Sequence, residues 1–299
     1  MPSPPLIPTR TSVGWAPLSL LTAATTWGLI WYPYRLLEQH GLSGSQSSLL
    51  TYLLGLPVLL WLARRQDWRG APGQRFWLLA TALTAGWTNL SYVLAVLHGE
   101  VMRVMLLFYL APLWTVFFAR FLLNERTELR GMVVMALALL GAIVMLDRDG
   151  SLPLPASAAE WLGLSSGMGF ALTNVLTRKV RAVPIETRSL WVFAGVGLMA
   201  GLSTLLENGV SAQLSPISLP DWGMMAGIAL ALILATFTVQ YGLARVSANR
   251  AIVILLFELV VAAFSSHFLA EESMQLRDWL GGALIVTATL FSVKEDRHD

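Results

Sequence analysis

Two apolar stretches decide the fold of this chain: LLFYLAPLWTVFFARFLLNE at residues 106–125 and IVILLFELVVAAFSSHFLAE at residues 252–271. As a helix, each is long enough to cross the roughly 30 Å hydrocarbon core of a bilayer. They lie 146 residues apart, each ends in a glutamate, and each precedes a further apolar segment that contains glycine. The chain therefore carries an internal repeat whose unit is a group of membrane-spanning helices.

The composition is that of a polytopic membrane protein. Of 299 residues, 56% are hydrophobic and only 13% are charged, about half the charged share usual in soluble domains. A soluble enzyme and a disordered chain are both excluded on this ground. The chain has no cysteine, so disulfides, thiol nucleophiles and thiolate metal sites are excluded as well.

Neither a nucleic-acid partner nor a cofactor is expected. The net charge is +2, but the basic residues lie in short loops between apolar segments and form no continuous basic face. The four histidines, at positions 40, 98, 267 and 298, lack the spacing of metal ligands. The expected surroundings are a lipid bilayer and a small-molecule substrate.

The hydropathy pattern predicts an all-α membrane protein with ten transmembrane helices. The spans are 15–34, 45–63, 76–97, 101–123, 131–146, 161–177, 189–206, 222–243, 250–269 and 279–293. They divide the chain into an N-terminal tail (1–14), a first five-helix repeat (15–146), a linker (147–160), a second five-helix repeat (161–293) and a C-terminal tail (294–299). The first span is too long for the apolar region of a signal peptide and is expected to be retained.

The loops predict an orientation. With the N-terminus in the cytoplasm, 16 of the 20 Lys and Arg residues fall on the inner side and four on the outer side, which is the bias that sets topology. Both tails are then cytoplasmic, and the expected location is a bacterial inner membrane. Because each repeat has an odd number of spans, the halves cross the membrane in opposite senses, and such inverted repeats build a central cavity where they meet.

Several short motifs carry a family resemblance. They are Thr26-Trp27-Gly28, Tyr109-Leu110-Ala111-Pro112, Asn124-Glu125-Arg126, Leu172-Thr173-Asn174-Val175-Leu176-Thr177-Arg178-Lys179 and Leu269-Ala270-Glu271. With them, residues 15–293 resemble the drug/metabolite transporter superfamily, in its exporter branch of two five-helix EamA-like repeats. The resemblance implies a ten-helix basket around a central substrate cavity and the export of amino acids or related metabolites. One departure is Glu258, which stands where the family usually has a proline.

Glu258 and Pro112 occupy equivalent positions of the two repeats, near the centres of their spans. An ionised carboxylate facing lipid would cost at least about 2.5–3.5 kcal/mol, so Glu258 should face the interior, be protonated or have a partner. Two interpretations stay open: a cavity carboxylate that meets a substrate ammonium group or relays a proton, and a neutral side chain bonded between helices. Pro112 cannot donate to the carbonyl of Phe108, which either offers an acceptor in the cavity or only bends the helix.

Further polar and aromatic residues inside the spans are candidates for lining the cavity. Trp27 shares one helix face with Trp31 and Tyr34, and the latter two fit helix packing and the membrane interface better. The remaining candidates are Asn89, Tyr92, Tyr109, Asn174, Gln240 and Tyr241. Hydrogen bonds between helices and helix caps are the alternatives for these side chains. Glu125 and Glu271 follow their spans directly, and we expect each to stabilise the N-terminus of the next helix.

The sequence predicts a secondary transporter that exports amino acids, aromatic ones among the candidates, or similar small metabolites by alternating access. No phosphate-binding loop is present, so this chain is not expected to hydrolyse ATP or to be an enzyme. Nothing fixes an oligomeric state, and a monomer is compatible with the sequence.

Two other functions stay open. Gly163-Leu164-Ser165-Ser166-Gly167 matches a nucleophile pattern, and Ser165 with His267 would make an intramembrane serine hydrolase. Because the pattern lies in an apolar span, close helix packing through its two glycines is favoured. A metabolite channel without saturation is the other alternative.

Overall fold

The computed structural model describes residues 15–66, 72–99, 101–126, 128–146, 154–208, 217–269 and 274–294. The regular structure of these residues is entirely helical. Arg148, Glu271, the predicted N-terminal tail and residues 295–299 lie outside the described residues, as does the first half of the predicted linker, residues 147–153.

The described helices form ten rods that follow the ten predicted spans. They are α2 (Ala16–Gln39), α3 (Gly44–Ala63), α4 (Pro72–His98), α5 (Val101–Phe108), α6 (Ala111–Phe118), η1 (Ala119–Leu123), α7 (Leu129–Leu146), α8 (Ala158–Lys179), α9 (Ile185–Asn208), α10 (Leu219–Leu243), α11 (Ala248–Leu255), α12 (Phe257–Leu269) and α13 (Leu276–Lys294). The fourth rod consists of α5, α6 and η1, and the ninth of α11 and α12. The first helix is longer than predicted, because it continues five residues past position 34.

Six helices in the described residues are long and apolar enough to cross a membrane, judged by length and composition. They are Gly44–Ala63, Val104–Leu123, Leu129–Leu146, Ile185–Leu206, Leu219–Leu243 and Ala248–Leu269. Three of the remaining rods, α2, α4 and α8, pack against several other helices. A helix enclosed by protein needs less apolar surface than one that meets lipid, which accounts for their more polar composition.

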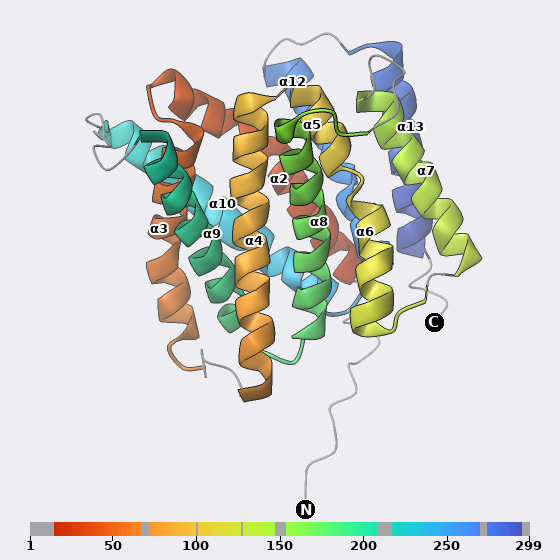
Figure 1. Ribbon diagram of the computed structural model, residues 1–299, viewed down its shortest axis with the longest axis horizontal. Coiled ribbons are helices and arrows are strands. Elements are labelled where there is room, and N and C mark those ends of the chain that lie inside the picture. The colour runs from red at the N-terminus through yellow and green to blue at the C-terminus, as the bar shows by residue number, and fades with distance from the viewer. Residues whose placement is uncertain are drawn as a thin grey trace, which may run out of the picture.

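The packing of the rods repeats itself along the chain (Figure 1). α4 of the first repeat packs against α8 of the second, and α10 of the second repeat packs against α2 of the first. The rod of α5 and α6 packs against α8, as the rod of α11 and α12 packs against α2. The pairs α3 with α9 and α7 with α13 join equivalent helices of the two repeats. Exchanging the two repeats therefore turns each of the first contacts into its counterpart. The contacts α3 with α9 and α7 with α13 stay the same under this exchange.

The first helices of the two repeats run in opposite directions. Ala16 and Leu20, at the start of α2, pack in one cluster with Leu243 at the end of α10. The carbonyl of Leu243 also accepts a hydrogen bond from Arg178, at the end of α8. The start of α2 and the end of α8 therefore lie at the same end of the bundle.

The fourth rod of the first repeat and the ninth rod of the chain are interrupted at equivalent residues. Leu113 N–H donates to the Leu110 carbonyl at 3.0 Å, and Leu259 N–H donates to the Leu256 carbonyl at 3.1 Å. Pro112, in the first turn of α6, has no N–H to continue the helical ladder, which explains the first break. The second break forms without a proline, so the packing of the repeat imposes it there.

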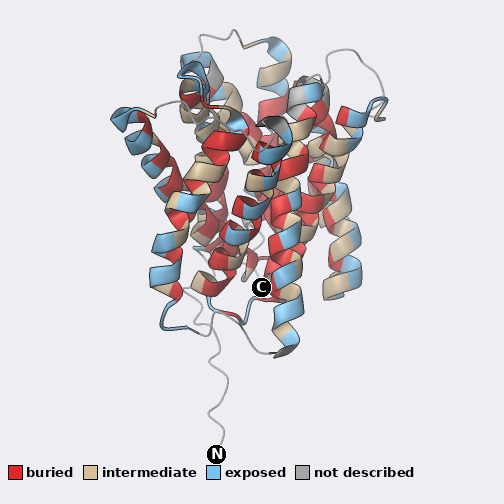
Figure 2. Ribbon diagram, turned by 60° about the vertical axis from the view of Figure 1, so that its left-hand side comes forward, coloured by how far each residue is buried: buried red, intermediate tan, exposed pale blue. Residues whose placement is uncertain are grey.

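Burial follows the inner faces of the helices (Figure 2). Buried residues line the surfaces that face neighbouring helices, whereas large apolar side chains are exposed on the outside, such as Phe121 at 68% and Leu230 at 61%. Apolar side chains exposed all around a bundle are typical of surfaces that meet lipid.

Glycine permits a very close crossing between α4 and α9. A Cβ atom added at Gly195 would lie 2.1 Å from the carbonyl oxygen of Ala82, which is backbone and cannot move aside. On the same helix, a Cβ atom at Gly197 would meet nothing closer than 3.8 Å. The two helices can therefore approach this closely only while residue 195 has no side chain.

We predict that Gly195→Ala destabilises the protein by about 1–3 kcal/mol, because overpacking forces the backbones apart. Gly197→Ala is the matched control on the same helix and should change the melting temperature little. Thermal unfolding in detergent measures both variants. Equal melting temperatures for the two would contradict the close crossing of α4 and α9.

Candidate functional site

The two helix breaks meet at the centre of the bundle. α6 packs against α11, and the side chains of Tyr109 and Glu258 are within hydrogen-bonding reach of each other. Tyr109 lies between α5 and α6, and Glu258 lies in the first turn of α12. The contact therefore joins the interrupted helix of one repeat to that of the other.

Two features make the interior tolerable for Glu258. The carboxyl group is in the first turn of a helix, where the helix dipole favours negative charge. Tyr109 can donate its hydroxyl hydrogen to it. Glu258 lies deep in the protein, although the residue as a whole is only partly buried.

Aromatic rings from four helices connect to this position. Trp27 of α2 contacts Phe170 of α8, with ring centroids 6.0 Å apart. Phe170 contacts Phe108 of α5 at 5.4 Å, and Phe108 contacts Tyr92 of α4 at 5.4 Å and Tyr109 at 5.1 Å. These five residues are named the aromatic cluster. With Glu258 they form a site made of one carboxyl group and mainly aromatic surface.

The sequence did not point to Phe108 and Phe170. Both are apolar residues in apolar spans, and from sequence they look like any phenylalanine that faces lipid. Phe108 directly precedes Tyr109, and Phe170 lies one helical turn before Asn174. The closeness of Phe108 and Phe170 in sequence to these candidate residues is the signal that could have identified them.

The motif around Trp27 fixes α12 against α2. A Cβ atom at Gly28 would lie 2.8 Å from the Glu258 carbonyl oxygen. Ser265 Oγ donates to the Gly28 carbonyl at 3.1 Å and accepts from Trp31 Nε1 at 2.9 Å. Trp31 thus has the packing role expected for it, and its nitrogen is bonded inside the protein rather than at the membrane interface.

The acceptor freed by Pro112 faces another helix. A Cβ atom at Gly167 would lie 2.4 Å from the carbonyl oxygen of Phe108, so this carbonyl is packed against the backbone of α8. Gly163 makes a similar approach to Val104. The two glycines therefore serve close packing of α8 against α5 within the chain.

Asn89 shares a face of α4 with Tyr92. Both side chains are partly buried, and they project away from Leu83 and Trp87, which are each 42% exposed. Asn89 thus faces the protein, on the side of the helix that also brings Tyr92 to Glu258.

The other three candidates have contacts elsewhere. Asn174 is buried in α8, and its Nδ2 has no hydrogen-bond acceptor among the described residues. Gln240 Nε2 donates to Ser189 Oγ at 3.2 Å and so links α10 to α9. The ring of Tyr241 lies 3.6 Å from the guanidinium carbon of Arg245, near the end of α10.

The residues of the hydrolase alternative are engaged in other contacts. Ser165 Oγ donates to the Leu162 carbonyl of its own helix at 2.9 Å. The ring of His267 contacts that of Phe268, with centroids 5.0 Å apart. Within the described residues, no group of three or more metal-ligating side chains could hold a metal ion.

The architecture is that of a multi-pass membrane transporter built from two related halves. The chain belongs to the EamA-like transporter family, whose model matches residues 14–147 and again residues 157–294. The two matches confirm the repeat and the family resemblance, which fits the drug/metabolite transporter superfamily.

Similar proteins agree with this assignment. An uncharacterised transporter of Archaeoglobus fulgidus is 26% identical over 219 residues, 73% of this chain and 76% of the relative. An uncharacterised transporter of Pseudomonas aeruginosa is 28% identical over 218 residues, 69% of this chain and 70% of the relative. One crystal structure superposes with a TM-score of 0.74 over 97% of this chain and 99% of the other, at 18% identity, which shows the shared fold.

We predict that Tyr109→Phe lowers the free energy of unfolding by about 1–3 kcal/mol, because it removes the hydroxyl group near a deeply placed carboxyl group. Tyr32→Phe is the control, since Tyr32 lies outside the aromatic cluster and contacts the ring of Trp31. Thermal unfolding of the purified variants compares them. Identical melting temperatures for Tyr109→Phe and wild type would show that the hydroxyl group does not stabilise Glu258.

Proposed function

We propose that this protein is a secondary transporter that exports amino acids, aromatic ones among them, or similar small metabolites, and that it works by alternating access. The site is formed by Glu258 and the aromatic cluster, with Asn89 beside it on α4. Transport is a property of the family, whereas the substrate and the mechanism are proposals.

The observation that carries the proposal is a carboxyl group near Tyr92 and Tyr109, at the break of the ninth rod, with further aromatic rings packed against these two. A carboxylate attracts the ammonium group of an amino acid, and aromatic faces attract the same cation. The rings also offer apolar surface to a flat side chain. In the proposed complex, the carboxyl group of Glu258 binds the amino group, and the aromatic cluster contacts the rest of the solute.

Alternating access is supported by the packing of the two repeats. α2 and α8 begin at opposite ends, and the contacts between rods match in pairs. The interrupted helices occupy equivalent positions and meet at Glu258. Inverted repeats with broken helices near the midplane are the arrangement in which rocking of one half opens a central site to each side in turn.

Orientation in the membrane also belongs to the proposal. The end of the bundle with Arg178 and Lys179 also carries the start of α2, the end of α3 with Arg64 and Arg65, and the start of α4 with Arg75. Arg250 near the start of α11 bonds the Ser292 carbonyl of α13, so that helix ends there too. Under the positive-inside rule this end is cytoplasmic, in a bacterial inner membrane.

Counterflow in proteoliposomes tests the proposed function. Vesicles containing only this protein are preloaded with unlabelled tryptophan, phenylalanine, tyrosine or leucine, and entry of the labelled solute is measured. We expect saturable, transient accumulation of labelled solute, as a carrier produces. Linear flux without counterflow would indicate a channel, and no flux for a broad panel of amino acids would refute the substrate class.

We predict that Glu258→Gln lowers kcat/KM for amino-group substrates about 10- to 100-fold, because a hydrogen bond to a charged group contributes about 1.5–3 kcal/mol. The exposed Glu128→Gln is the control for loss of one negative charge and should transport as wild type does. Counterflow at several pH values measures both. A fully active, pH-independent Glu258→Gln protein would reduce Glu258 to a structural residue.

A further inference from the structure

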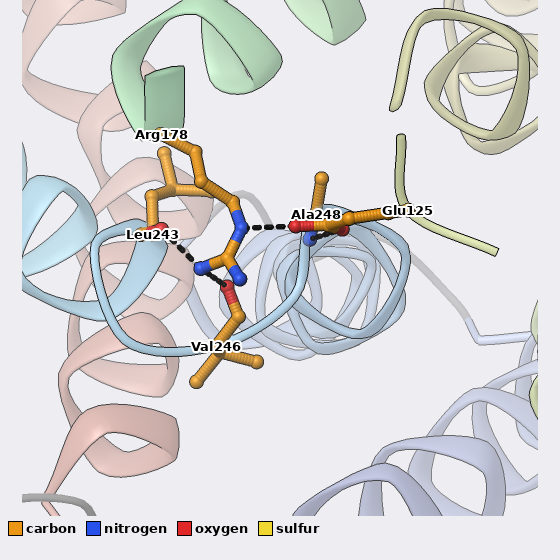
Figure 3. Close-up of polar contacts among 5 residues, drawn as sticks. All are labelled: Glu125, Arg178, Leu243, Val246 and Ala248. Carbon is orange, nitrogen blue, oxygen red and sulfur yellow. Dashed lines mark hydrogen bonds and ion pairs between the residues drawn. The ribbon is translucent and has the colours of Figure 1, made fainter. Parts of the chain in front are cut away.

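Polar contacts at the end of the bundle that carries Arg178 join three chain segments, as Figure 3 shows. The carboxylate of Glu125 accepts from Arg178 Nε and, at 3.0 Å, from the backbone N–H of Ala248. Arg178 Nη1 also donates to the carbonyl oxygens of Leu243, at 3.1 Å, and Val246. These five residues are named the clasp.

The clasp connects the two repeats. Glu125 belongs to the first repeat, and the other four residues of the clasp belong to the second. We expected Glu125 to stabilise the N-terminus of the next helix in the chain, which would be α7. The structure corrects this: Glu125 bonds the first N–H of α11, which is 123 residues away. The expected chemistry of a carboxylate at a helix N-terminus is present, but on a helix of the other repeat.

Both partners of the ion pair are held in place by their surroundings. The backbone N–H of Glu125 bonds the Ala119 carbonyl at 3.1 Å. Beside Arg178, Lys179 Nζ donates to the Leu122 carbonyl at 2.7 Å and lies 4.6 Å from the ring centre of Trp77. The family-like motifs at residues 124–126 and 172–179 thus meet in one structure.

The ion pair is largely shielded from water, although it lies at the end of the bundle. The side chain of Arg178 is 13% exposed and that of Glu125 is 18% exposed. Directly inside it, Ala119, Val175 and Ala248 pack together and are almost fully buried. The clasp and these small residues therefore close this end of the protein.

A short helix leads from the clasp to the carboxyl group of the site. α11 begins at Ala248, whose N–H bonds Glu125, and ends at Leu255, immediately before the break at Leu256. Glu258 follows in the first turn of α12. Eight helical residues span about 12 Å, so a movement of Glu125 relative to Ala248 is transmitted to the break beside Glu258.

We propose that the clasp is the gate of the transport pathway at this end, and that Glu125 and Arg178 are positioning residues for transport. This inference rests on the proposed alternating access. When the site opens to this side, Glu125 separates from Arg178 and Ala248, and α11 moves away from the fourth rod. Charged groups suit such a gate because water can solvate both partners once they separate, whereas removing one partner leaves the other uncompensated.

The chain offers a direct test, because it contains no cysteine. Ala119→Cys places a single thiol behind the clasp, at a position that is 0% exposed. The rate of its reaction with a membrane-impermeant maleimide, added from the clasp side of oriented vesicles, reports how often the gate opens. In the otherwise unchanged protein we expect slow labelling.

We predict that Glu125→Ala and Arg178→Ala each accelerate labelling of the Ala119→Cys thiol at least about tenfold, because they remove one partner of a shielded ion pair. The same variants should lower the kcat of transport more than they change KM. The exposed Glu128→Ala and Arg120→Ala are charge-matched controls near the clasp and should leave both quantities unchanged. Folded Glu125→Ala and Arg178→Ala proteins that label at the rate of the unchanged protein would overturn the proposal.

Milder variants keep the test decisive if the alanine variants misfold. Glu125→Gln retains an acceptor for Ala248 N–H but loses the charge, so its labelling rate should lie between those of the unchanged protein and Glu125→Ala. The labelling rate of Arg178→Lys should likewise be intermediate. If both variants were labelled at the rate of the unchanged protein, the proposal that the clasp is a gate would be overturned. If the wild type shows no transport at all, the proposed function fails, whereas the labelling rates still decide whether the clasp closes this end.

Discussion

The structure depends on one constraint, the placement of the Glu258 carboxyl group in the interior of an apolar bundle. Such a group is costly unless a helix end, a donor or water compensates it. The chain supplies the first by interrupting the ninth rod and the second by bringing Tyr109 from the fourth rod. For the helix end and the Tyr109 hydroxyl group to act on the same carboxyl group, the two breaks must meet. This in turn requires a close approach of the neighbouring helices. Gly28 gives that approach on the side of α2, and Gly167 gives it on the side of α8. Glycines remote in sequence from Glu258 thus help to make the carboxyl group tolerable.

The helical rods follow from the sequence because hydropathy records the length that must cross the bilayer. The first break follows as well, since Pro112 removes a backbone donor. The second break could not be predicted, because nothing in the local sequence around Leu256 forbids a continuous helix. It reproduces the hydrogen-bond pattern of the first break, 146 residues away. The two repeats therefore share one backbone geometry. In the first repeat the local sequence, through Pro112, accounts for it, whereas in the second repeat we attribute it to helix packing.

The members of the candidate site that the sequence could suggest are those marked by polarity or by the repeat offset, namely Tyr92, Tyr109 and Glu258. It was not predictable where the contribution is an apolar ring, as at Phe108 and Phe170, because the direction of a side chain is decided by tertiary packing. Polarity alone also selected Gln240, which donates to Ser189 of a neighbouring helix. The partner of Glu125 escaped sequence reasoning for another reason: Arg178 and Ala248 are 53 and 123 residues away from it, and only the meeting of the repeats brings them together.

A second polar contact between the repeats lies at the opposite end of the bundle. His40, just after α2, approaches Asp221 in the first turn of α10, with Nδ1 and Oδ1 2.6 Å apart. Here the His40 side chain is 52% exposed and that of Asp221 is 8% exposed, whereas both partners of the clasp are shielded. Water screens an exposed pair and weakens it, while a shielded pair resists the loss of either partner. The two ends thus carry polar contacts that differ in their shielding from water. Under the proposed alternating access, the partly exposed contact at the His40 end would separate more easily than the clasp.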